Sequence, residues 1–157
     1  MSVIVIGVGN PIMGDDAIGI LTLEELRKIS NRTDTTFMTA QLSGIPLAEM
    51  LIGYDKAIII DSIIKTECRY GELCHLKSPK NSNQHSESMH TIGFHDAIHV
   101  LERHGARMPD AINIYAINIK FEQVVSDKIS EELAGNIPDY ALEIATIERL
   151  IEVKKVH

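Results

Sequence analysis

An apolar run followed by a glycine-rich segment constrains the fold of this chain more than any other feature. Val3-Ile4-Val5-Ile6 is β-branched and uncharged, which is typical of a strand buried on both faces of a parallel sheet. The segment that follows reads Gly7-Val-Gly9-Asn10-Pro-Ile-Met-Gly14-Asp15-Asp16-Ala-Ile-Gly19. We expect Asp15 or Asp16 to begin a helix and to accept hydrogen bonds from its free N–H groups. Two carboxylates then stand at the carboxyl end of a central strand, where open α/β sheets bind ligands.

Composition limits the remaining possibilities. The 157 residues are 45% hydrophobic and 24% charged, which predicts a single globular domain over residues 1–157. A net charge of -7 provides no basic surface for nucleic acid or an anionic membrane. No apolar run approaches the ~20 residues of a membrane span, and the N-terminus lacks the basic start of a signal peptide. Cys68 and Cys74 match no zinc or redox spacing, so we expect reduced thiols in a soluble cytoplasmic protein.

Hydrophobic periodicity predicts alternating strands and helices. Strands are expected at Val3–Ile6, Thr35–Ala40, Ala57–Ser62, Gly71–Leu76 and Ala111–Ile119, and helices at Ala17–Ser30, Ser43–Gly53, Thr91–His104, Ser126–Leu133 and Pro138–Val153. Gly71–Leu76 is more polar and is expected near an edge, and Ser78–Ser88 is expected to be an exposed loop. This order predicts an α/β three-layer sandwich: a mostly parallel, twisted sheet of about five strands with helices on both faces, as in phosphorylase/hydrolase-like folds.

A dinucleotide-binding loop is one interpretation of the opening glycines. That fingerprint requires a third glycine where this chain has Ile12, and an acidic residue where the second strand ends near Gln41. The carboxylates of Asp15 and Asp16 would also repel a pyrophosphate. The sequence therefore disfavours this interpretation.

A metal-binding cleft is the second interpretation. Asp16 follows the first strand and Asp61 closes the next long buried strand, so both side chains are expected to line one cleft if those strands are adjacent. His90 precedes a helix and could reach the same edge. Two carboxylates and one imidazole suit a borderline divalent cation with open coordination positions. Helix capping by Asp15 or Asp16, a turn role for Asp61 and an exposed position for His90 are the structural alternatives.

Several motifs in this order resemble one enzyme family. Gly7-x-Gly9-Asn10, Gly14-Asp15-Asp16-Ala-Ile-Gly19, Ile60-Asp61 and Ser88-Met-His90-x-Ile-Gly93 are similar to those of the nickel–iron hydrogenase maturation endopeptidases, the M52 peptidase type. The resemblance implies that Asp16, Asp61 and His90 together bind nickel and that catalysis depends on them. It implies that the nickel arrives in the hydrogenase large-subunit precursor, whose C-terminal extension the endopeptidase removes. We expect a monomer that acts on that precursor.

One loop departs from the family pattern. The second loop of the family often reads Asp-Gly-Gly-Thr/Ser-x-Gly, whereas this chain has Ala40-Gln41-Leu42-Ser43-Gly44. The resemblance therefore assigns no role to the Gln41–Gly44 loop. Covalent catalysis is disfavoured because no motif supplies a base for Ser43, Ser62 or Cys68.

Two other functions remain as alternatives. Peptidyl-tRNA hydrolases share the Gly-x-Gly-Asn-Pro opening, but they continue with a glycine where Ile12 stands and later carry a Thr-Arg-His-Asn run that is missing from this sequence. A non-catalytic nickel-dependent maturation chaperone would use the same ligands and cut nothing. Separately, His95 and His99 are spaced to hold zinc with Glu102 nearby, although a solvated helix face is the favoured interpretation.

Overall fold

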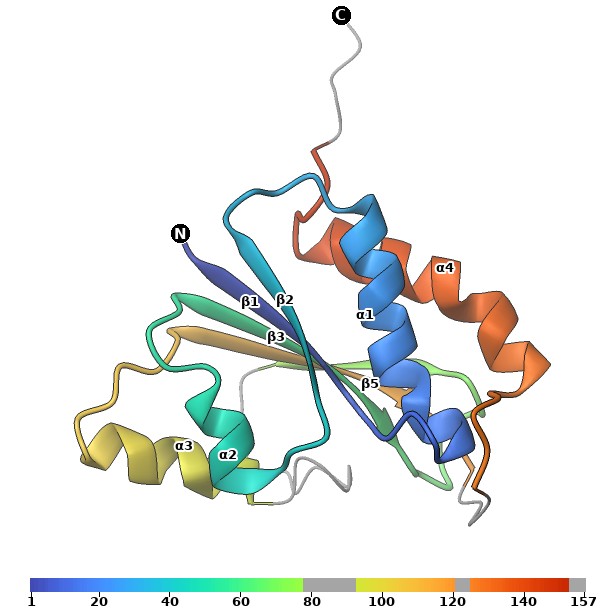
Figure 1. Cartoon of the computed structure of the whole chain (residues 1–157), viewed down its shortest axis with the longest axis horizontal. Helices are drawn as coiled ribbons and strands as arrows, with labels where there is room; N and C mark the ends of the chain where they lie inside the picture. Colours follow the sequence, from blue (N-terminus) through green and yellow to red (C-terminus); the bar gives the residue numbers. More distant parts are fainter. Residues whose placement is uncertain (78–92, 121–124, 153–157) are drawn as a thin grey trace, which may run out of the picture.

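A five-stranded sheet with the order β2-β1-β3-β5-β4 forms the middle layer of the computed structural model (Figure 1). The structure describes residues 1–77, 93–120 and 125–152. The strands are β1 (Val3–Val8), β2 (Thr35–Ala40), β3 (Lys56–Ile63), β4 (Leu73–Lys77) and β5 (Ala111–Asn118). All neighbouring strands are parallel except β4, which is antiparallel to β5 at one edge. The expected sheet and the edge position of its more polar strand are confirmed.

Helices cover both faces of the sheet, as expected. The 3₁₀ helix η1 (Gly14–Ala17) leads into α1 (Ile18–Ile29), which packs with α4 (Glu131–Ile147) on one face. The shorter helices α2 (Gly44–Glu49) and α3 (Phe94–Arg103) pack together on the other face (Figure 1). No helix in these described ranges is long and apolar enough to cross a membrane.

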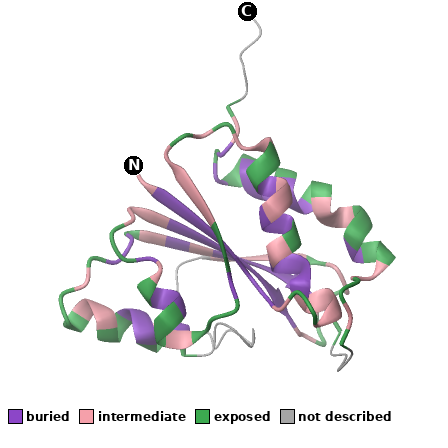
Figure 2. Cartoon of the chain, in the orientation of Figure 1, coloured by how far each residue is buried: buried purple, intermediate pink, exposed green. Residues whose placement is uncertain are grey.

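The two central strands are buried on both sides because each face of the sheet has its own hydrophobic core. Every residue of β1 is buried, and Val3 and Val5 face one core while Ile4 and Ile6 face the other. Figure 2 shows the resulting pattern, with buried central strands between helices that are buried only on their inner sides. An apolar run without alternation is thus the sequence signature of a strand with a helix layer on each face.

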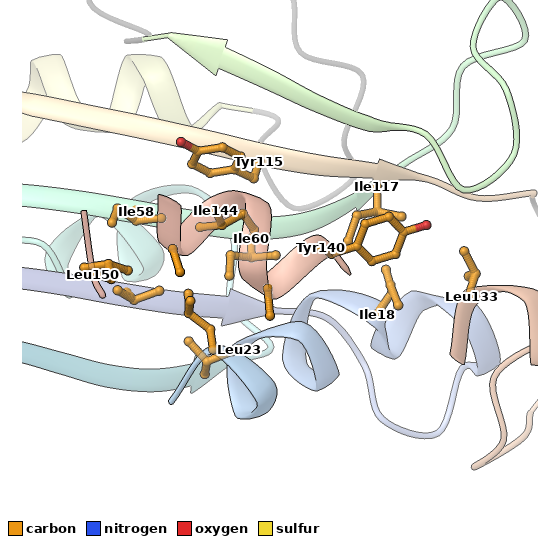
Figure 3. Packing of buried hydrophobic residues seen from close by; sticks show 14 of the residues in the cluster. Ile18, Leu23, Ile58, Ile60, Tyr115, Ile117, Leu133, Tyr140, Ile144 and Leu150 are labelled. Carbon is orange, nitrogen blue, oxygen red and sulfur yellow. The ribbon is translucent and has the colours of Figure 1, made fainter. Parts of the chain in front are cut away.

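The larger core lies between the sheet and the helix pair α1–α4. Tyr140 and Ile144 of α4 lie against the sheet, and Tyr140 lies between Ile18 of α1 and Ile117 of β5 in this view (Figure 3). Ile18 and Ile144 are fully buried. Burial of each large aliphatic side chain contributes about 1.5–3 kcal/mol, so this cluster is a principal source of stability.

The predicted pair of C-terminal helices, Ser126–Leu133 and Pro138–Val153, is wrong. One continuous helix, α4, contains Pro138. A proline inside a helix cannot donate to the carbonyl four residues earlier, which costs about 3 kcal/mol. Leu133 before it and Tyr140 after it are both buried in the same core, and this shared burial offsets the cost of continuing the helix.

The ends of α4 also differ from the expectation. The helix begins at Glu131 because the Ser130 hydroxyl caps it, accepting from the N–H of Leu133 at 3.5 Å. It ends at Ile147, and the chain then turns through Arg149, whose φ is 55°. Beyond the helix, the side chains of Glu148 and Leu150 are both buried.

A buried charge stabilises the end of the sheet where β3 begins. Glu148 pairs with Lys56, the first residue of β3, and accepts a hydrogen bond of 2.6 Å from the hydroxyl of Tyr115. Asn113 donates to the same carboxylate oxygen at 2.8 Å. Burial, together with the Glu148 contact, raises the pKa of Tyr115. A carboxylate with this many donors can be buried without a large net cost, and it joins α4 to β3 and β5.

Helix α1 lies unusually close to the sheet at Gly19. A Cβ atom on Gly19 would be 2.4 Å from the carbonyl oxygen of Val8 and 2.5 Å from that of Ile60. A Cβ on Gly9 would be 2.2 Å from the carbonyl oxygen of Asp16. These obstructions are backbone atoms, which cannot move aside independently, so glycine is required for the observed spacing of helix and sheet.

Replacement of Gly19 tests this packing. We expect Gly19→Ala to lower the free energy of unfolding by about 3 kcal/mol, because the added methyl group forces α1 away from β1 and β3. Helix propensity alone would predict a gain of about 1 kcal/mol from the same change, so the sign separates the two effects. Urea denaturation of both proteins provides the measurement.

Gly135 is the matched control, since it lies within α4 and a Cβ built there meets nothing within 4 Å among the described residues outside its own helix backbone. Gly135→Ala is expected to raise stability by about 0.5–1 kcal/mol. A Gly19→Ala protein as stable as the Gly135→Ala protein would contradict the close-packing argument.

Candidate functional site

The carboxyl ends of two adjacent strands position the predicted carboxylates. β1 pairs directly with β3, so the expected adjacency of those strands is confirmed. Asp16 lies in η1, just after β1, and Asp61 lies near the carboxyl end of β3. The two aspartates therefore come from neighbouring elements at one edge of the sheet.

Asp61 is completely buried, with 0% of its surface exposed. Its Oδ1 atom accepts a hydrogen bond of 2.7 Å from the backbone N–H of Ser62. A side chain that projects from a sheet face and is fully buried by the layer packed on it has little rotational freedom. Burial of such a group is stable only where donors or a cation compensate its charge.

Each oxygen of Asp16 accepts a hydrogen bond. The backbone N–H of Asn10 donates to Oδ2 at 2.9 Å, and the hydroxyl of Ser62 donates to Oδ1 at 2.7 Å. Unlike Asp61, the residue is partly exposed. A carboxylate oxygen has two lone pairs, so one accepted hydrogen bond does not by itself prevent it from ligating a cation.

Ser62 connects the two carboxylates. Its N–H donates to Asp61 and its O–H donates to Asp16, and the residue is only 6% exposed. Sequence reasoning considered Ser62 only as a nucleophile without a base and missed this role. The signal available was its position directly after Asp61, although the direction of its hydroxyl depends on the placement of η1.

Asp15 has a structural role that differs from that of Asp16. Its Oδ2 atom accepts from the hydroxyl of Tyr70 at 2.6 Å, and Oδ1 accepts from the backbone N–H of Ser130 at 2.8 Å. The expectation that Asp15 or Asp16 caps the following helix is wrong, because the N-cap of η1 is Met13 and no side chain caps it. Asp15 instead binds two donors far along the chain, and Asp16 binds one nearby donor, Asn10, and one distant donor, Ser62.

The third predicted ligand, His90, lies outside the described residues, as does the Ser78–Ser88 loop. Within the described ranges, no three side chains of His, Cys, Asp or Glu gather as a metal-binding group. The structure thus brings Asp16 and Asp61 to one edge through Ser62, and the participation of His90 stays a prediction.

A buried amide organises the segment between β3 and β4. Asn118, at the end of β5, accepts from the N–H of Lys65 at 2.8 Å and donates to the carbonyls of Cys68 and Arg69, each at 3.0 Å. This side chain is 3% exposed. It fixes the segment that carries Tyr70, which in turn holds Asp15. Nothing in the sequence singled out Asn118, because its partners lie 49 to 53 residues away.

Comparisons with known proteins agree with one another. A family model described as hydrogenase maturation protease, HycI, matches residues 20–147, a range that begins after Asp16 and includes positions 61 and 90. The hydrogenase-maturating endopeptidase HybD from Escherichia coli superimposes with a TM-score of 0.76 at 20% identity, covering 95% of this chain and 93% of that one. HybD from Thermococcus kodakarensis, a nickel–iron hydrogenase maturation protease, gives 0.68 at 21% identity, with coverages of 94% and 99%.

A third solved structure, the hydrogenase 2 maturation peptidase from a Thaumarchaeota archaeon, gives a TM-score of 0.67 at 20% identity over 96% of this chain and 100% of that chain. At these identities the structural matches establish the fold. A search of the curated proteins finds no match to the chain.

Alkaline titration tests the anchoring of η1 by Tyr70. Burial, and then the hydrogen bond to Asp15, raise the pKa of Tyr70 to about 12. An unfolded tyrosine titrates near pH 10, so the stability contributed by the neutral hydroxyl is fully present below about pH 10 and is lost as the pH rises towards 12. We expect the stability difference between the wild type and Tyr70→Phe to be constant below about pH 10 and to shrink above it.

Urea denaturation of both proteins from pH 7 to pH 11.5 measures this difference, and the subtraction cancels titrations that the two share. A difference that stays constant across the whole range would show that Tyr70 ionises as it does in the unfolded chain.

Proposed function

Because this chain belongs to the hydrogenase maturation protease family, we propose that it removes the C-terminal extension of a nickel-loaded nickel–iron hydrogenase large-subunit precursor. The observation that carries the proposal is the pair of carboxylates joined by Ser62 at the carboxyl edge of the sheet. In this proposal the nickel belongs to the substrate and serves as the recognition cue. Asp16, Asp61 and His90 are its ligands.

The donor chemistry supports this assignment. Two carboxylates and one imidazole provide oxygen and nitrogen ligands, and nickel accepts both kinds. Three protein ligands leave coordination positions for groups of the precursor. A precursor without the metal would present no cation to two neighbouring negative charges, so binding and cleavage would be conditional on metal loading.

The two carboxylates are held in place before any cation binds. Asp61 is fixed by burial and by its bond to the N–H of Ser62, while Asp16 is fixed at both oxygens. Little conformational freedom is therefore lost when the cation binds. The bound metal supplies Lewis-acid chemistry, and the residues of this chain hold the precursor so that its scissile bond lies nearby.

Exposed apolar side chains near this edge provide a contact surface for the precursor. Ile12 follows β1, Leu42 follows β2 and Ile45 lies in the first turn of α2, with 56%, 43% and 46% of their surfaces exposed. A precursor that has not yet closed over its metal site would expose apolar side chains that are buried after closure. We propose that these side chains contact the open precursor around the metal.

Substitution of the three ligands tests the function. In a cleavage assay on a nickel-loaded precursor from the same cell, Asp16→Asn, Asp61→Asn and His90→Ala are each expected to slow C-terminal shortening by at least about 100-fold. Loss of about 3 kcal/mol of metal-mediated stabilisation corresponds to that factor. Mass spectrometry of the large subunit is the measurement.

Asp110→Asn is the matched control, because Asp110 is an exposed carboxylate that directly precedes β5 at the opposite edge. It is expected to cleave at the normal rate. A second control omits nickel from the precursor, and no shortening is expected. If the protein forms a stable nickel-dependent complex with the precursor but does not shorten it, the chaperone alternative is correct and the endopeptidase proposal is wrong. If the nickel-free precursor is cleaved, nickel is not the recognition cue.

Ser62→Ala tests the connection between the carboxylates. Removal of a group that orients metal ligands typically costs 10–100-fold in affinity or activity, so nickel-dependent binding of the precursor should weaken by about that factor. Ser62→Thr keeps a hydroxyl and is expected to bind the nickel-loaded precursor more tightly than Ser62→Ala does. If Ser62→Ala binds the precursor normally but abolishes cleavage, the hydroxyl acts as a nucleophile and its positioning role is wrong.

A further inference from the structure

Two histidines meet on the outer face of α3. His95 and His99 are one helical turn apart, and their Nε2 atoms lie 3.2 Å from each other. Their rings are perpendicular, with centroids 4.6 Å apart. The two nitrogens share a hydrogen bond, and the pair therefore already brings one nitrogen of each ring together beside the helix.

The separation of these nitrogens matches that of two ligands on one transition-metal ion. Imidazole nitrogens bind such ions at about 2.0–2.1 Å. Two nitrogens at that distance lie about 2.9 Å apart at a right angle and about 3.4 Å apart at a tetrahedral angle. The observed 3.2 Å falls between these values, so an ion can bind both rings with little rearrangement.

The helix holds the pair in place. Phe94, Ala97 and Ile98 are buried against the sheet, which fixes the rotation of α3 and leaves the opposite face outward. His99 has 47% of its side chain exposed, so an ion and its waters can reach the pair. The backbone spacing of the two histidines is thus set before any ion binds.

An acidic side chain supports the same pair. Glu102 lies one turn further along α3, with its Oε2 atom 3.8 Å from Nδ1 of His99. This is the ring nitrogen that does not contact His95, and the carboxylate lies at ion-pair distance from it, so its negative charge favours a cation at this face of α3. Arg103, in the last turn of α3, adds one positive charge next to Glu102.

We propose that His95 and His99 form a two-nitrogen chelate site for a divalent transition cation, namely Ni²⁺, Cu²⁺ or Zn²⁺. Water completes the coordination shell, consistent with the fact that no three ligand side chains gather in the described ranges. Imidazole pairs select these borderline ions over Mg²⁺ and Ca²⁺, which prefer oxygen. The site shares no residue with the Asp16, Asp61 and His90 set and does not depend on the proposed function.

Calorimetric titration of the full chain with NiCl₂ tests the site. His95→Ala and His99→Ala are each expected to weaken one class of Ni²⁺ binding by about 10²-fold, because the second contact of a chelate acts at a high effective concentration. His90→Ala should leave this class unchanged, which separates it from nickel bound with Asp16 and Asp61. MgCl₂ should produce no binding of this class.

His104→Ala is the matched control, because His104 is exposed at the end of the same helix and one of its ring nitrogens contacts the carbonyl oxygen of Val100 at 2.8 Å. His104→Ala should bind Ni²⁺ with the same affinity as the wild type in this calorimetric titration. In NMR spectra, paramagnetic Ni²⁺ should broaden the ring signals of His95 and His99 first. Unchanged Ni²⁺ binding in His95→Ala and His99→Ala, or equal broadening of all exposed histidines, would overturn the proposal.

Discussion

The close contact between α1 and the sheet is the constraint on which the rest of the structure depends. Gly19 lies against the carbonyl oxygens of Val8 and Ile60, and Gly9 lies against the carbonyl of Asp16. These contacts set the distance between η1 and β3. At that distance the hydroxyl of Ser62 reaches Asp16 while its N–H reaches Asp61. The glycines therefore determine the carboxylate geometry without contributing any functional group.

Much of the fold could be predicted because its strands have unambiguous patterns. The apolar runs that became β1 and β3 lack alternation, and this identified them as central parallel strands. The C-terminal helices were mispredicted because a local rule, proline as a helix breaker, was overridden by burial of Leu133 and Tyr140 on either side of Pro138. Local rules of this kind do not include the free energy of packing between distant parts of the chain.

The candidate site was predictable only in part. The sequence indicated that acidic residues would gather where the strands end and singled out Asp16 as a ligand, but it could not show what Asp15 does instead. That role depends on partners far along the chain, since Tyr70 and Ser130 lie 55 and 115 residues from Asp15. Sequence position also concealed the role of Ser62, whose hydroxyl has meaning only once η1 is placed beside β3.

The exposed side chains that surround this edge have a consequence for how such proteins can diverge. Ile12, Leu42 and Ile45 are largely outside the hydrophobic cores, whereas the carboxylates are fixed by glycine contacts, backbone N–H groups and one serine. Mutations in the apolar rim can therefore accumulate at little cost in folding free energy. Substitutions there can reshape this face of the molecule while the scaffold beneath it is retained. A TM-score of 0.76 at 20% identity shows that this fold persists when most of its residues differ.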